Sequence, residues 1–129
     1  MKKLINIKMI ITNKKDIETR LIDFSVRVID FSEQQGKHPA VIHLKDQALR
    51  SSTATALNYA EAQSAESKKD FIHKLGIVIK ELRETQASLR IIYKFSESPN
   101  EQVFRTLLQE NDELLAIFHK TIMTSKKNL

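Results

Sequence analysis

Five polar residues have types and spacings that could do acid–base chemistry or bind one another: Arg50, Asn58, Glu61, Glu81 and Glu84. Arg50 and Glu61 can share one face of a helix, while Glu81 and Glu84 are neighbours on the next helix. An arginine that faces carboxylates across a helix pair forms a bidentate bridge, which fixes helix register or a subunit contact. A catalytic acid pair is the weaker interpretation. We therefore interpret the five residues as a structural polar network.

The chain offers little else for catalysis or metal binding. It has no nucleophile-elbow sequence and no glycine-rich phosphate loop. A di-metal bundle site needs two Glu-x-x-His pairs, and the nearest match, Asp70-x-x-His73, occurs once. His38 and His43 lie near a loop, and the chain has no cysteine. The sequence predicts neither a catalytic residue nor a metal or cofactor, and it does not predict an enzyme.

A basic strip is the best functional candidate from residue types alone. Five cationic residues recur in steps that place them on one helix face: Lys69, Lys80, Arg83, Arg90 and Lys94. They would present positive charge over about 38 Å at about 1.5 Å per residue. Such a strip would bind phosphate by charge, with salt sensitivity and weak selectivity. The alternative is an ordinary solvated outer face.

The helix that carries this strip has more apolar surface than one small bundle uses. Its core seam recurs in steps of four and three: Phe71, Leu75, Val78, Leu82, Thr85, Leu89 and Ile92. Further apolar side chains widen the seam or lie further round the helix: Ile72, Ile77, Ile91 and Tyr93. Apolar surface in excess of a core marks a subunit contact, so these four residues predict a homo-oligomer.

Three more helices precede and follow that one. Asn13 can cap the first, whose seam runs from Ile17 to Phe31 and which ends before Gly36. The second is rich in small residues. Its seam is Leu44, Ala48, Ser51, Thr55, Asn58 and Ala62, with Ser52, Ala56 and Tyr59 as the alternative. Ser67 caps the third helix, with Asp70 three residues later. Ser98 as cap, Pro99 as first helical residue and Glu101 completing a capping box begin the fourth.

These elements predict an all-α, antiparallel up-down-up-down four-helix bundle over residues 14–124, because short connections force neighbouring helices to run antiparallel. The helices span about 14–35, 41–63, 67–97 and 99–124. We predict that residues 1–13 form a flexible tail. Lys8 interrupts the apolar run of the tail and no cleavage site follows, so we expect a cytoplasmic protein and not an exported or membrane one. The formal net charge of +5 permits an anionic partner.

Three runs of this sequence support a family resemblance. They are residues 49–53 (LRSST), residues 58–75 (NYAEAQSAESKKDFIHKL) and residues 80–85 (KELRET). In these runs the chain resembles the bacterial four-helix bundle proteins named after the intervening sequences of 23S ribosomal RNA genes, over about residues 15–122. The resemblance implies a bundle that assembles as a ring-shaped homopentamer. It also implies kinship with the accessory proteins of diversity-generating retroelements, basic pentamers that engage a reverse transcriptase and nucleic acid. It supplies no enzymatic activity.

The sequence therefore favours a non-enzymatic, homo-oligomeric helical scaffold that binds RNA or a nucleic-acid-handling protein, such as a reverse-transcriptase-like protein, through the basic strip. The alternative is a purely structural or protein–protein interaction module without nucleic-acid binding. An enzyme that uses Glu81, Glu84 or Glu61 with Arg50 is the weakest of the three classes.

Overall fold

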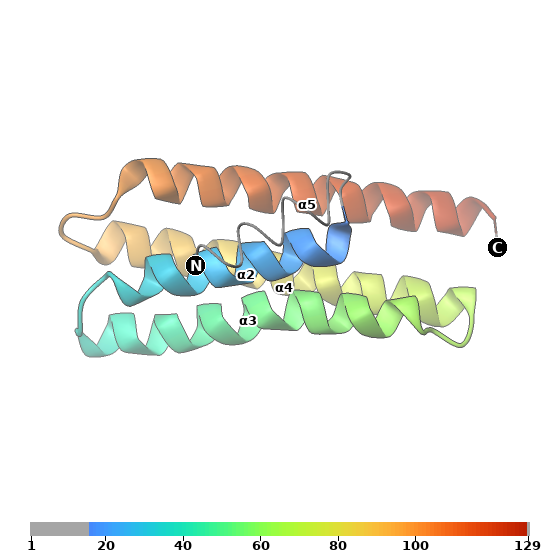
Figure 1. Cartoon of the computed structure of the whole chain (residues 1–129), viewed down its shortest axis with the longest axis horizontal. Coiled ribbons are helices and arrows are strands. Elements are labelled where there is room, and N and C mark those ends of the chain that lie inside the picture. Colours follow the sequence, from blue (N-terminus) through green and yellow to red (C-terminus); the bar gives the residue numbers. More distant parts are fainter. Residues whose placement is uncertain (1–15, 129) are drawn as a thin grey trace.

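The computed structural model describes residues 16–128, and these residues form four α-helices and no strand. The helices are α2 (Ile17–Glu33), α3 (Pro39–Gln63), α4 (Lys68–Phe95) and α5 (Glu101–Lys127). Figure 1 shows that successive helices run in opposite directions along one long axis. The predicted all-α four-helix fold is confirmed. The tail predicted for residues 1–13 and the cap predicted at Asn13 lie outside the described residues.

The core follows the predicted helix seams. On α4 every seam residue from Leu75 to Ile92 is buried, and Phe71 is half-buried. On α2 the buried apolar residues include Phe24 and Val28, as its seam predicts. For α5, steps of four and three predict the seam Phe104, Leu108, Asn111, Leu115, Phe118 and Ile122. The helix also buries two leucines outside this seam, Leu107 and Leu114. The apolar stripe of α5 is therefore wider than predicted, because this helix packs against both α4 and α2.

Helix α3 uses both of its alternative seams, because it packs between α2 and α4. Ser51, on the first seam, faces α4, and its Oγ lies 2.7 Å from Thr85 Oγ1. Ser52, on the second seam, faces α2, where its Oγ accepts a 3.4 Å hydrogen bond from Ser25 Oγ. Both serines are buried. Small side chains at these positions let the neighbouring helices approach closely, and the hydroxyls that enter the core find partners there.

Helices α2, α3 and α5 begin at residues other than those predicted. Helix α2 begins at Ile17 instead of residue 14, with Asp16 as its cap, and Asp16 Oδ1 accepts the Thr19 N–H at 3.4 Å. Helix α3 begins at Pro39 instead of residue 41, with His38 as its cap, and His38 Nδ1 accepts the Ala40 N–H at 3.1 Å. Proline is well suited to the first helical position because it has no N–H that would be left unpaired there. Ser67 caps α4 as predicted, and its Oγ accepts the Asp70 N–H at 3.0 Å.

The prediction for the start of the last helix was wrong. Asn100 is the cap, and its side chain accepts the Val103 N–H at 3.1 Å, so α5 begins at Glu101. Pro99 stays in the connection instead of opening the helix, and Glu101 does not complete a capping box. Asparagine caps helices as well as serine does, and the helix begins at the later of the two possible caps. Upstream, α4 ends at Phe95, because the Ser96 N–H and hydroxyl both donate to Ile92 O.

None of the helices within residues 16–128 is long and apolar enough to cross a lipid bilayer.

The two glycines should respond in opposite ways to the same substitution. A Cβ added at either one would meet no atom within 4 Å, but Gly36 has φ +93° and Gly76 is helical. Gly76→Ala should therefore raise the free energy of unfolding by about 0.5–1 kcal/mol. Gly36→Ala should lower it by about 1–2 kcal/mol, because a side chain is strained in the left-handed region. Urea unfolding curves of both variants measure this, and equal effects would contradict the assignment.

Candidate functional site

The basic strip on α4 lies on the outside of the bundle. All five of its members, Lys69, Lys80, Arg83, Arg90 and Lys94, are exposed. They lie on the side of α4 opposite the buried seam, because α3 and α5 pack on the seam and its flanks. Gly76, also exposed, and Ala87 lie between them. The strip is therefore a row of cations, and no long side chain projects from the helix at these two small residues.

None of the five strip cations forms an ion pair with a carboxylate of residues 16–128. Four cations elsewhere in the described residues do form ion pairs, and Arg20 is an example: it donates to Glu110 Oε1 at 2.6 Å and to Glu113 Oε1 at 3.1 Å. The nearest partner of the strip is His119 on α5, whose Nε2 lies 3.3 Å from Arg83 Nη2. An imidazole does not neutralise a guanidinium. The charge of the strip is thus left for a partner or for solvent.

The five residues predicted to form one polar network come together only in part. Glu81 shares a hydrogen bond with the Glu84 carboxyl and is attracted by Arg50. The other two, Glu61 and Asn58, bond elsewhere. Glu61 accepts a hydrogen bond from Lys74 Nζ at 2.6 Å, and Asn58 donates to Ala54 O at 2.8 Å within its own helix. Arg50 is exposed and forms no ion pair within the described part of the chain. The sequence pattern missed Lys74, because the Glu61–Lys74 pair crosses the α3–α4 connection, where helix periodicity gives no register.

Glu81 and Glu84 are one helical turn apart on α4, and their environment disfavours two negative charges. Burial raises the pKa of Glu81, and a hydrogen bond shared with the Glu84 carboxyl and the charge of Glu84 raise it further. Lys80 and Arg50 oppose this shift by attraction. Neither carboxylate lines any of the hollows described below. Glu81 is therefore a carboxyl with a raised pKa that lines none of these three hollows.

The four residues predicted as a subunit contact divide into two groups. Tyr93 stacks on Phe104 of α5, with ring centroids 4.0 Å and planes 6° apart, so its ring packs within one subunit. Its hydroxyl donates to Glu101 Oε1 at 3.3 Å. Ile91 has 51% of its surface exposed, whereas Ile72 and Ile77 are half-buried. Ile91 is therefore the most exposed of the four.

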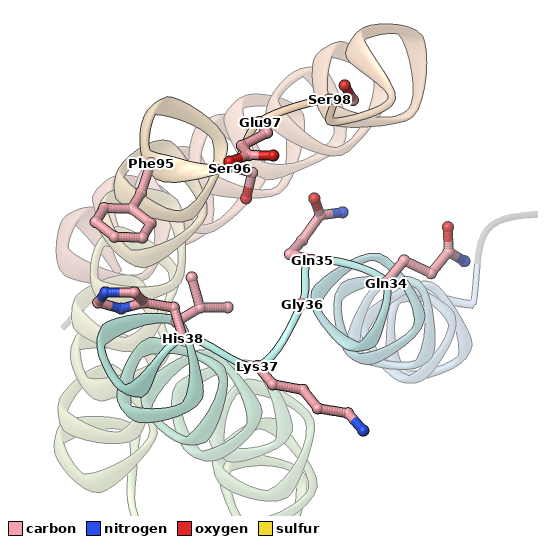
Figure 2. Close-up of a pocket in the computed structure, with 10 residues that line it drawn as sticks. Gln34, Gln35, Gly36, Lys37, His38, Phe95, Ser96, Glu97 and Ser98 are labelled. Carbon is pink, nitrogen blue, oxygen red and sulfur yellow. The ribbon is translucent and has the colours of Figure 1, made fainter.

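A hollow of about 540 Å³ lies at one end of the bundle, between the α2–α3 and α4–α5 connections (Figure 2). Gln35 and Ser96 point toward it from the two connections, and Lys37 points away. The rings of Phe95 and His38 lie at its edge with centroids 4.6 Å apart. Sequence reasoning missed this hollow, since two loops distant along the chain build it. Smaller hollows, of about 400 Å³ beside Arg27 and about 280 Å³ beside Ser32, open elsewhere.

The residues considered for metal binding remain apart. His43 and His73 are exposed, on α3 and α4. Within residues 16–128 no three histidine, aspartate or glutamate side chains are grouped so that they could hold a metal ion.

Comparisons with known proteins agree with the geometry of the fold. Residues 13–120 match the profile of the family described as 23S rRNA-intervening sequence protein. A crystal structure of a protein of unknown function from Bacteroides thetaiotaomicron, assigned to the S23 ribosomal protein family, is similar to this chain with a TM-score of 0.71 and 26% identity. The similarity covers 81% of this chain and 96% of the other. A comparison with curated proteins gave no match.

The raised pKa of Glu81 predicts a pH dependence of stability. The folded state keeps a proton that the unfolded chain releases near its ordinary value of 4.5. This contribution to stability is present below that value and is lost as pH rises through the folded-state pKa. The melting temperature of wild type should therefore fall relative to Glu81→Gln as pH rises from about 4 to about 7. Glu84→Gln should weaken this pH dependence. A difference in melting temperature between wild type and Glu81→Gln that stays constant from about pH 4 to about pH 7 would contradict the prediction.

Proposed function

Because the chain belongs to the 23S rRNA-intervening sequence protein family, we propose that it is a non-enzymatic, cytoplasmic helical scaffold that binds RNA through the basic strip on α4. The observation that supports this most is the row of five exposed cations without carboxylate partners among the described residues. A formal net charge of +5 acts in the same direction. In this proposal a nucleic-acid-handling protein, such as a reverse-transcriptase-like protein, can act on RNA held by the strip.

The strip binds phosphates by charge. Lysine and arginine side chains on a straight helix offer donors at intervals along one line, and each phosphate contact releases a counterion. Such contacts position a nucleic acid without reading its bases. Gly76 and Ala87 help, since a backbone can approach the helix more closely where no long side chain projects. The binding is therefore strong at low salt and weakly selective.

The scaffold acts as a homo-oligomer, and the resemblance of the chain to its family implies a homopentamer. Ile91, 51% exposed, is the residue that supports a subunit contact most, and Ile77 lies on the same side of α4 four turns earlier. Ile72 is half-buried as Ile77 is, but it lies about 100° round the helix from Ile91 and contributes less. Repetition of the strip around a ring would multiply weak phosphate contacts into stable binding.

A protein–protein interaction module without RNA binding is the alternative function. Exposed apolar side chains support it: Leu57 is 65% exposed and Ile91 51%. A protein partner would cover such residues, whereas RNA would leave them exposed. The ratio of absorbance at 260 and 280 nm of the purified protein distinguishes the two at once, since bound nucleic acid raises it.

Charge reversal on the strip should abolish RNA binding. The variant Lys80→Glu, Arg83→Glu, Arg90→Glu replaces attraction to phosphate by repulsion, so a gel shift with short RNA at low salt should show no retained complex. Circular dichroism should be unchanged, because all three side chains are exposed. The matched control reverses Lys120, Lys126 and Lys127, also exposed, with the same change in net charge. Equal retention by the strip variant and wild type would refute the strip as the binding surface.

The proposed subunit contact has its own test. Ile91→Glu should lower the mass in light scattering toward that of one chain, because a charge cannot be buried in an apolar contact without a large cost. Ile42→Glu is the matched control, since Ile42 is also 51% exposed but lies on α3. A wild-type protein that is already monomeric at micromolar concentration, or an unchanged mass for Ile91→Glu, would remove this contact.

A further inference from the structure

Phe95 stands apart from every other phenylalanine and tyrosine in residues 16–128. It is 48% exposed, whereas all the others are buried or half-buried. It lies in the last turn of α4, directly after Lys94 of the basic strip. An exposed aromatic ring beside a hollow is a candidate contact for a partner, since aromatic rings contribute large apolar area to interfaces. Successive helical residues are about 100° apart, so Phe95 lies at the edge of the strip, on the side of α4 that also carries Ile91 one turn earlier.

The hollow beside Phe95 carries hydrogen-bonding groups that its own subunit uses only in part. Gln35 Nε2 donates to Phe31 O at 2.8 Å, which leaves the amide oxygen and the second amide proton without partners in the described part of the chain. The Ser96 hydroxyl donates to Ile92 O and keeps its acceptor capacity. At about 540 Å³ the hollow lies within the range of about 300–1,000 Å³ of small-molecule sites.

An unpaired base of single-stranded RNA matches this combination. Single-stranded RNA is recognised by stacking of bases on aromatic side chains and by hydrogen bonds to their edges, which a duplex cannot offer. The His38 ring packs on one side of Phe95 and leaves the remainder of the ring open. The Glu97 carboxylate, which also lines the hollow, repels phosphate but can accept a hydrogen bond from the amino group of a base.

We infer that Phe95 stacks with an unpaired base of single-stranded RNA whose phosphates lie on the basic strip, with the base edge directed into the hollow between Gln35 and Ser96. This inference rests on the proposed RNA binding and adds a preference to it. The strip alone accepts any nucleic acid, whereas Phe95 makes the protein favour single strands over duplexes.

Three substitutions at Phe95 separate stacking from simple apolar contact. Phe95→Ala should weaken binding of a short single-stranded RNA by about 5- to 150-fold, the range for loss of one base–aromatic stack. Phe95→Tyr should stay within a few-fold of wild type, because it keeps the ring. Phe95→Leu, which keeps the apolar bulk and loses the ring, should resemble Phe95→Ala. Binding of a blunt RNA duplex should be the same for all four proteins.

The possible results separate a failure of base stacking by Phe95 from a failure of RNA binding by the strip. If wild type binds no RNA, or the strip variant binds as wild type does, the proposed function fails and this inference with it. If wild type binds RNA through the strip but Phe95→Ala binds single strands equally well, only the stacking inference is overturned. It is also overturned if Phe95→Leu matches wild type, or if Phe95→Ala changes the oligomeric mass in light scattering, because the ring then serves a subunit contact.

Discussion

The close contact between α3 and α4 is the constraint on which the rest of the molecule depends. Small residues line the side of α3 that faces α4, and the Ser51 and Thr85 hydroxyls meet there at 2.7 Å. Each hydroxyl also has a carbonyl acceptor in its own helix: Glu81 O lies 2.9 Å from Thr85 Oγ1, and Ala48 O lies 3.5 Å from Ser51 Oγ. Both residues are buried, and a buried hydroxyl without a partner costs about 1–3 kcal/mol. A shift in helix register would break this pairing.

A second polar contact holds α4 from the other side. Asn111 of α5 is fully buried and its Nδ2 donates to Leu82 O at 3.0 Å. The Thr85 hydroxyl contacts α3, and the Leu82 carbonyl contacts α5. Helix α4 therefore has little freedom to rotate about its own axis. Lys80 lies five positions before Thr85, about 140° round the helix. The packing of the core thus determines that the strip faces outward, and the strip depends on uncharged residues that never contact a ligand.

Periodicity predicted most of the fold, because an apolar seam in steps of four and three has one structural solution. It placed the strip outside for the same reason. It failed at helix ends, where Asn100 and Ser98 are both competent caps and local sequence does not choose between them. It also failed where contacts depend on how helices meet: Tyr93 stacks on Phe104, Glu61 pairs with Lys74, and two loops form the hollow beside Phe95. Such pairings depend on tertiary register, which one helix does not encode.

The central claim is that the five outward cations of α4 form a phosphate-binding surface, and the salt dependence of RNA affinity tests it most directly. Each phosphate of a single strand that is neutralised contributes about −0.7 to the slope of log K against log salt concentration. Five contacts from one strip predict a slope of about −3.5, with about −1.4 for a variant that retains two of the cations. A wild-type slope near zero, or the same slope for wild type and that variant, would contradict the account.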